Sequence, residues 1–174
     1  MKVEQFFQQS LGEWHSMRSG HSLAFKHFEE IRSKISIQPI NITNPEVITI
    51  LDLNKPIEGK RLDPFKISWV SESDWEQDKS SNLSKGSSIL IPFLVSKDKG
   101  LILRSKGYAE AISAISSYSF IPDGTLNLQT KYESSFVEEK IWFTSNKVRC
   151  RASVIKSSKT LAILQTSFSS EVKI

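Results

Sequence analysis

The chain has 174 residues, of which 39% are apolar and 24% charged, so a single folded domain over residues 1–174 is expected and disorder is not. Its longest apolar run, Ile89 to Val95, is too short to span a bilayer, and the single Cys150 excludes an internal disulfide and any multi-cysteine metal site. The net charge of +4 is concentrated in residues 140–174, where seven Lys or Arg stand against one Glu. Solvated lysines along strand edges are the first interpretation, and an acidic protein, a nucleic acid or a carboxylate-bearing ligand is the alternative.

The first part of the chain predicts a short helix followed by two strands. Residues 3–11 place Phe6 and Phe7 on the apolar side of an amphipathic helix. Residues 15–25 predict a strand. Residues 34–42 alternate apolar and polar side chains, which is the pattern of a half-buried strand.

A second helix is predicted near residues 44–53. Asn44 is a good capping residue, Pro45 fits the first turn, and Glu46 places an acid at the positive end of the helix. The helix is therefore expected to cover an end or a face of whatever the strands build.

From residue 65 onward the sequence predicts mainly β-strands. The clearest alternation places Leu126, Leu128 and Thr130 on one face and polar residues on the other. The predicted strands cover residues 65–69, 87–96, 101–108, 115–120, 126–132, 138–143, 148–156 and 161–168. Short turns between antiparallel strands favour closure into a barrel, because closure removes exposed edges, and a two-sheet sandwich is the alternative.

The segment Gly12-x-Trp14, after a helix, predicts a barrel-closing arrangement when an arginine stands on a late strand. In that arrangement the Trp plugs one end of the barrel and the arginine packs over its ring. Either Arg149 or Arg151 is a candidate for this structural role.

Arg149 and Arg151 share one strand face, because side chains alternate along a strand. Both face water, or both face a polar interior where guanidinium groups bind carboxylates; the sequence leaves the two alternatives open. Cys150, between them, is interpreted as a small packed thiol rather than a nucleophile, since no base stands beside it.

The turn before Val148 decides which acid joins the arginines. A four-residue turn, 144–147, places Glu138 on the arginine face, whereas a three-residue turn, 145–147, places Glu139 there. A carboxylate buried beside two arginines is a candidate functional site, and two solvated glutamates are the alternative.

The remaining chemistry-bearing residues give weaker signals. Trp69 lies on an apolar strand face, where core packing and stacking on a flat ligand are both open, and Trp75 follows near the end of that strand. His15, His21 and His27 are spaced six apart, which matches no conventional metal-binding spacing, so no metal site is expected.

Several of these residues occur together in an order that resembles one family, the S-type phycobiliprotein lyases (the CpcS/CpeS chromophore lyases). The resemblance covers nearly the whole chain. It is carried by Phe6-Phe7, Gly12-x-Trp14-x-Ser16-x-Arg18-Ser19-x-His21, Leu23-Ala24-Phe25-Lys26, Ser68-Trp69, Asp74-Trp75-Glu76, Lys106-Gly107-Tyr108-Ala109-Glu110, Glu138-Glu139-Lys140-Ile141-Trp142-Phe143 and Val148-Arg149-x-Arg151.

The resemblance implies an all-β fold with minor helix: a lipocalin-like or fatty-acid-binding-protein-like antiparallel barrel of about eight to ten strands. It also implies an enzyme that binds a linear tetrapyrrole (a phycobilin, with phycoerythrobilin one candidate) and delivers it for thioether attachment to a cysteine of a phycobiliprotein subunit. The bilin is then the substrate, and no tightly bound cofactor is expected.

The resemblance also implies which residues form the site. The ligand-binding residues would be Arg18, Trp69, Trp75, Glu139, Arg149 and Arg151, with Glu139 and Arg149 catalytic. Glu139 is chosen over Glu138 because its spacing to the first strand arginine matches the family, which requires the three-residue turn. The chain departs from the family at Cys150, where Leu is more usual, and at Lys140, where Arg is frequent.

The expected partners are the bilin and the acceptor subunit, with a homodimer as a further expectation and neither nucleic acid nor membrane. The N-terminus lacks the apolar core of a secretory signal, so a cytoplasmic location is expected, or the plastid stroma in an alga. The alternative function is a lipocalin-like carrier of a fatty acid or other apolar ligand without transfer, and a nucleic-acid-binding barrel is the weakest option.

Overall fold

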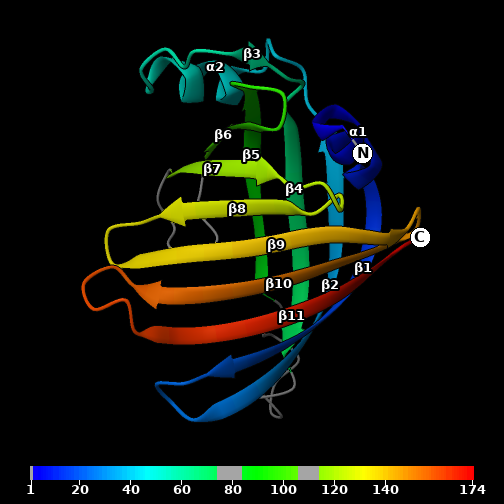
Figure 1. Ribbon diagram of the computed structural model, residues 1–174. Helices are drawn as coiled ribbons and strands as arrows, with labels where there is room; N and C mark the ends of the chain where they lie inside the picture. The colour runs from blue at the N-terminus through cyan, green and yellow to red at the C-terminus, as the bar shows by residue number, and fades with distance from the viewer. Residues whose placement is uncertain (1, 74–83, 106–113) are drawn as a thin grey trace.

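The computed structural model describes residues 2–73, 84–105 and 114–174 (Figure 1). Within them the strands form one antiparallel sheet in the order β3-β5-β4-β2-β1-β11-β10-β9-β8-β7-β6, and β6 pairs back onto β5. The strands are β1 Gly12–Ser22, β2 His27–Pro39, β3 Lys60–Arg61, β4 Phe65–Ser73, β5 Ser84–Leu94, β6 Lys99–Arg104, β7 Ala114–Phe120, β8 Leu126–Lys131, β9 Ser135–Ser145, β10 Val148–Ser157 and β11 Ile163–Lys173. The expected barrel is confirmed: ten of these described strands close it, and the two-residue β3 is added beside β5.

Both predicted helices are confirmed, and they lie in different parts of the molecule. The helix α1, Val3–Ser10, buries Val3, Phe6 and Phe7 in the core at one end of the barrel. The helix α2, Pro45–Asp52, packs outside the barrel against β5 and β6, where Val47 and Ile50 meet a separate apolar cluster. Neither helix of the described residues is long and apolar enough to cross a membrane.

Local chemistry explains where α2 begins. Asn44 Oδ1 accepts a hydrogen bond of 2.9 Å from the Glu46 backbone N–H, and Pro45 occupies the first turn, where no N–H is required. The predicted start of the helix is confirmed to the residue, because capping is a short-range signal.

The first two strands differ from the predicted ranges. The strand expected over 15–25 is β1, which begins at Gly12, and the strand expected over 34–42 is β2, which begins seven residues earlier at His27. The two form a long hairpin whose turn places Lys26 at a φ of 53°. The predicted strand is shorter than β2 because Phe28 and Ile31 lie on opposite faces among charged residues, so no apolar–polar alternation is visible before residue 34.

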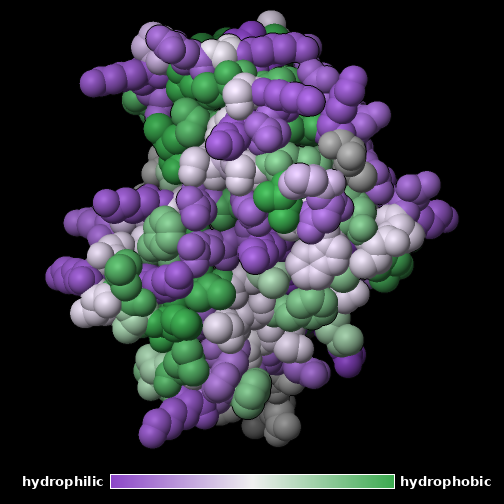
Figure 2. All heavy atoms as spheres, viewed as in Figure 1, coloured by the Kyte–Doolittle hydropathy of each residue, from purple (hydrophilic) through white to green (hydrophobic). Residues whose placement is uncertain are grey.

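Strand alternation divides the side chains between the barrel interior and the outer surface. Leu126, Leu128 and Thr130 of β8 are buried inward, as predicted, whereas Gln129 and Lys131 face outward and are exposed. Hydrophilic side chains accordingly cover much of the outer face seen in Figure 2.

The interior itself has an apolar half and a polar half. The apolar half surrounds α1 and includes Trp14, which is completely buried. Farther from α1, pairs of inward hydroxyl groups bridge neighbouring strands at 2.7–2.8 Å. These pairs are Ser33–Ser71, Ser116–Thr130 and Ser153–Ser167. A β-barrel core built only for stability would hold hydrocarbon at such positions, so the polar half is the place to look for a site.

Candidate functional site

The β9–β10 hairpin decides which acid faces the interior. Its turn has only two residues, with Ser145 paired to Val148, and a β-bulge between Val148 and Arg149 then places Arg149 opposite Phe143. Neither predicted turn length is correct. The bulge nevertheless supplies the odd residue that the three-residue turn would have supplied. Glu139 therefore lies on the arginine face, as predicted.

Arg149 is held in place by two partners. Its Nε donates a hydrogen bond of 2.6 Å to Glu171 Oε2, and its Nη2 lies 2.5 Å from the same oxygen. Its guanidinium carbon lies 4.8 Å from the centre of the Trp14 ring, so Arg149 is the arginine that packs over the barrel-closing tryptophan. Trp14 Nε1 in turn donates to the Ser10 carbonyl of α1 at 2.9 Å.

Burial and charge both act on this pair. Burial lowers the pKa of Arg149, and the neighbouring Glu171 opposes that effect. Burial on its own would raise the pKa of Glu171, but the charges of Arg151 and Arg149, with the hydrogen bond from Arg149, outweigh it and hold that pKa below its ordinary value. Glu171 is therefore ionised at neutral pH.

A second buried acid, Glu139, lies between two further arginines. Its Oε1 accepts a hydrogen bond of 3.2 Å from Arg151 Nη1, and its Oε2 lies 3.7 Å from Arg104 Nη2. Arg151 Nε is also 4.0 Å from Glu171 Oε1, so the two acids are linked through Arg151. The side chain of Glu139 is 2% exposed and that of Arg151 is 24% exposed, so this pair reaches from the core toward the accessible polar half.

Arg18 and Trp69 are brought to the same interior. Arg18 is paired in register with Ser169 of β11 and lies on the inward face of β1. Trp69 lies inward on β4, directly beside Gly86 of β5. Trp75, the remaining predicted site residue, lies outside the described residues.

Glu171 and Arg104 are site residues that the sequence patterns did not single out. Glu171 is the direct cross-strand neighbour of Arg149, and a signal exists in β11, where Ser167, Ser169 and Glu171 form a polar face while Phe168 and Val172 stand on the other. Arg104 follows Ile102 by two residues, so the inward position of Ile102 predicts that Arg104 also points inward.

Cys150 lies on the opposite side of β10 from the arginines, paired with Trp142 of β9 and Ser170 of β11. Its thiol is buried, and burial together with the charge of Glu171 raises its pKa. This agrees with the interpretation of Cys150 as a packed thiol rather than a nucleophile.

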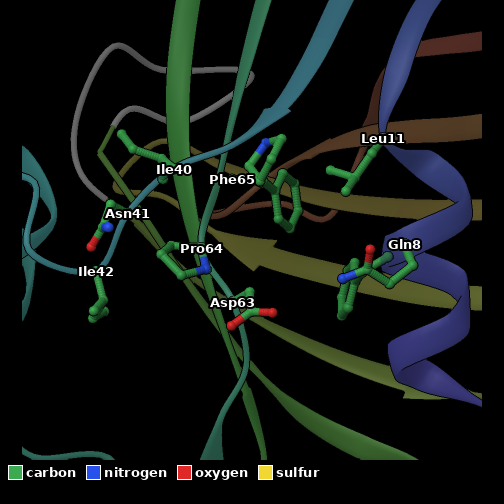
Figure 3. A pocket seen from close by; sticks show the side chains of 10 residues that line it. Gln8, Leu11, Ile40, Asn41, Ile42, Asp63, Pro64 and Phe65 are labelled. Carbon is green, nitrogen blue, oxygen red and sulfur yellow. The ribbon is translucent and has the colours of Figure 1, made fainter.

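A separate cleft of about 360 Å³ lies near the α1 end of the barrel. Figure 3 shows Gln8 of α1 and Leu11, which follows the helix, on one side of it, and Pro64 and Phe65 with the segment Ile40–Ile42 on the other. None of the interior arginines or glutamates lines this cleft, so the charged cluster is a distinct site.

Comparisons with known proteins agree with this geometry. A family model described as CpeS-like protein matches residues 2–174. "Chromophore lyase CpcS/CpeS 3" of Trichodesmium erythraeum is 44% identical, covering 99% of both chains, and "Chromophore lyase CpcS/CpeS" of Thermosynechococcus vestitus is 32% identical, covering 100% of this chain and 93% of that one. The solved S-type phycobiliprotein lyase CPES of Guillardia theta superposes with a TM-score of 0.86 at 33% identity, covering 100% of this chain and 93% of that one.

Proposed function

The chain belongs to the CpeS-like family, and from that membership we propose that it is a chromophore lyase: it binds a linear tetrapyrrole and delivers it for thioether attachment to a cysteine of a phycobiliprotein subunit. The observation that carries the proposal is the buried charged cluster in the polar half of the barrel, where Glu139 lies between Arg151 and Arg104. A carrier of purely apolar ligands would not require such a buried charged cluster.

The chemistry of a bilin matches these side chains. A bilin carries two propionate groups, which suit guanidinium groups such as those of Arg18 and Arg151. Its pyrrole nitrogens donate hydrogen bonds, and Glu139 Oε2 accepts none from the described residues. We assign Glu139 to the pyrrole nitrogens and Trp69, with Trp75, to the flat faces of the tetrapyrrole.

Arg149 has a different place in this proposal. Its guanidinium is engaged by Glu171 and Trp14, and its side chain is 4% exposed. We therefore propose that Arg149 is a positioning residue. It holds Glu171 in place, and Glu171 in turn orients Arg151.

The reaction itself is an addition. The acceptor's thiolate attacks the ethylidene group of the bilin, a carbon–sulfur bond forms, and the proton from the thiol finishes on the tetrapyrrole, so nothing is oxidised or reduced. The protein's contribution is to hold one conformer of the bilin and to present the ethylidene end to the acceptor, which is catalysis by positioning. Glu139 is the carboxyl group nearest the proposed pyrrole contacts and is the candidate for holding a proton during the transfer.

The alternative of a fatty-acid carrier fits the interior less well. A fatty acid has one carboxylate and a long apolar tail, whereas the polar half of this barrel holds several charges and hydroxyl pairs. The lyase function also accounts for the names of the relatives. It implies that the protein works beside phycobiliprotein subunits, in the cytoplasm or, in an alga, in the plastid stroma.

Co-production with a bilin-synthesis pathway and candidate acceptor subunits tests the proposal. A lyase gives a strongly coloured, red-shifted complex and then a fluorescent acceptor subunit whose colour survives denaturation. Pathways for phycoerythrobilin and phycocyanobilin, run in parallel, identify the substrate. A coloured complex that transfers its pigment to none of the acceptor subunits would instead indicate a carrier without lyase activity.

A further inference from the structure

Arg104 is a largely buried arginine for which the described part of the chain supplies no hydrogen-bond acceptor at Nε. It lies on the inward face of β6, paired in register with Leu90 of β5, and its side chain is 10% exposed. Among the described residues the acid beside it is Glu139, whose Oε2 lies 3.7 Å from Arg104 Nη2, too far for a hydrogen bond. Its Nε is buried and has no hydrogen-bond partner within residues 2–73, 84–105 and 114–174.

The two arginines of β10 differ from Arg104 in that each donates a hydrogen bond to an acid. Arg149 donates to Glu171 at 2.6 Å, and Arg151 donates to Glu139 at 3.2 Å. Glu139 is thus already bound on one side by Arg151, and Arg104 faces its other oxygen without closing the gap. A charged group that has left water without gaining hydrogen bonds destabilises the empty protein. The arrangement is explained when a ligand supplies the missing acceptor.

The chemistry of the guanidinium group limits what that ligand group is. Arginine has five N–H donors in a planar fork and no acceptor, and the fork matches a carboxylate with two parallel hydrogen bonds. A donor or a cation leaves Arg104 Nε unmatched, and a neutral oxygen accepts its hydrogen bond without balancing its charge, so a carboxylate is the best match to this guanidinium. The strand around Arg104 is otherwise uncharged on its inward side, with Ile102 and Gly100 as its inward neighbours, so β6 itself supplies no acid.

We propose that Arg104 binds one propionate carboxylate of the bilin, and that it thereby selects the diacid form of the ligand. This inference rests on the proposed lyase function. It adds a residue on β6 to Arg18 of β1 and Arg151 of β10, so that carboxylate recognition extends to a third, separate strand of the barrel.

A ligand and protein cycle tests the assignment. Phycocyanobilin and phycoerythrobilin, each as the free diacid and as the dimethyl ester, are titrated into the wild-type protein and into Arg104→Gln. The wild type should bind the diacid at least about tenfold more tightly than the diester, and Arg104→Gln should remove about tenfold from diacid affinity while changing diester affinity less than about twofold. Equal losses for diacid and diester, or no loss for either, would overturn the assignment.

Two controls separate this contact from general effects of charge and folding. Arg32→Gln removes the same charge from an exposed, outward-facing position on β2 and should leave both affinities unchanged. Arg104→Met replaces this cation, whose only described acidic contact is the 3.7 Å approach to Glu139, by a hydrocarbon chain of similar length, and the thermal midpoint of the empty protein should stay the same or rise. A large fall in that midpoint would make Arg104 a structural residue and overturn the proposal. If the wild-type protein binds neither bilin, the proposed lyase function is wrong, and the assignment of Arg104 is wrong with it.

Discussion

Trp69 lies directly over Gly86 on the neighbouring strand: a Cβ built on Gly86 would come within 2.2 Å of Trp69 Cζ2. The two residues are paired in register between β4 and β5. Because Gly86 has no side chain, the indole ring of Trp69 occupies the space where a Cβ would be. A glycine inside a strand weakens it, so its presence here is explained by the position that it gives to the tryptophan.

Gly86→Ala should therefore displace Trp69 and weaken bilin binding without unfolding the barrel. Loss of an aromatic contact costs about 0.5–1.5 kcal/mol, which corresponds to binding weaker by a factor of roughly two to thirteen. Absorbance titration with bilin measures the effect, and near-ultraviolet circular dichroism reports the movement of the ring.

Gly20→Ala is the matched control for that change. Gly20 is also inward in a strand, but a Cβ there meets its nearest neighbour, Gln165 Nε2, at 3.4 Å, which is an ordinary contact. The double variant Gly86→Ala with Trp69→Phe should regain part of the lost affinity, because the smaller ring tolerates the added methyl group. Wild-type affinity in Gly86→Ala would show that the position of Trp69 does not matter for binding.

The two arginines of β10 should separate stability from binding. Arg149→Met leaves Glu171 buried with its strongest partner gone, and removing one member of a buried ion pair costs about 3–5 kcal/mol of folding free energy. Arg151→Gln, at a side chain that is partly exposed, should cost less stability, about 1–3 kcal/mol, and should weaken bilin binding at least tenfold. Urea unfolding followed by tryptophan fluorescence, with bilin titration of the folded fraction, measures both. Equal stability losses in the two variants would contradict this division of roles.

Glu171 should make the stability of the barrel depend on pH in the acid range. Its pKa is lowered in the folded protein from the ordinary value of 4.5, so below about pH 4.5 the unfolded chain takes up the proton more readily than the folded one. The stability that the ionised Glu171 contributes is present above that pH and is lost as the pH falls through the lowered pKa. Urea unfolding between pH 7 and pH 3 should show this loss in the wild type.

Glu171→Gln should give a protein that is less stable at pH 7 but whose stability falls less steeply in acid. The slope contributed by one proton is at most about 1.4 kcal/mol per pH unit. Glu133→Gln, at an exposed residue in the β8–β9 turn, serves as the control and should keep the wild-type slope. Parallel curves for the wild type and Glu171→Gln would show that Glu171 is not the group responsible.

Short-range signals predicted most of the fold. Alternation assigned the inward residues of β8, and the capping residue Asn44 located the start of α2. The pairing of Trp14 with a late arginine was also predictable as a type of contact, although sequence alone left Arg149 and Arg151 equivalent. Only the closed barrel distinguishes them, since it places Arg149 at the level of Trp14.

The site required information that alternation does not contain. A bulge at Val148, not a longer turn, sets the register of β9 against β10, and nothing in a single sequence marks a bulge there. The pairing of Arg149 with Glu171 depends on which strand follows β10 in the sheet. The approach of Arg104 to Glu139 depends on where the barrel closes, because β6 and β9 are separated by two strands in the sheet order. Charged residues on the strands therefore predicted a polar interior, but they did not predict which arginine pairs with which glutamate.

Cys150 should take no part in the transfer, although it lies between the two arginines in sequence. It is on the outer side of β10, and its raised pKa leaves little thiolate at neutral pH. Cys150→Ala should transfer bilin to the acceptor at the wild-type rate, and the wild-type lyase should retain no pigment after denaturation. In the native protein a thiol reagent should modify Cys150 slowly at pH 7 and faster as the pH rises, whereas in urea the reaction should be fast. Pigment that stays on the denatured wild-type lyase but not on Cys150→Ala would instead identify a covalent intermediate and would require the bilin to reach the outer face of the barrel.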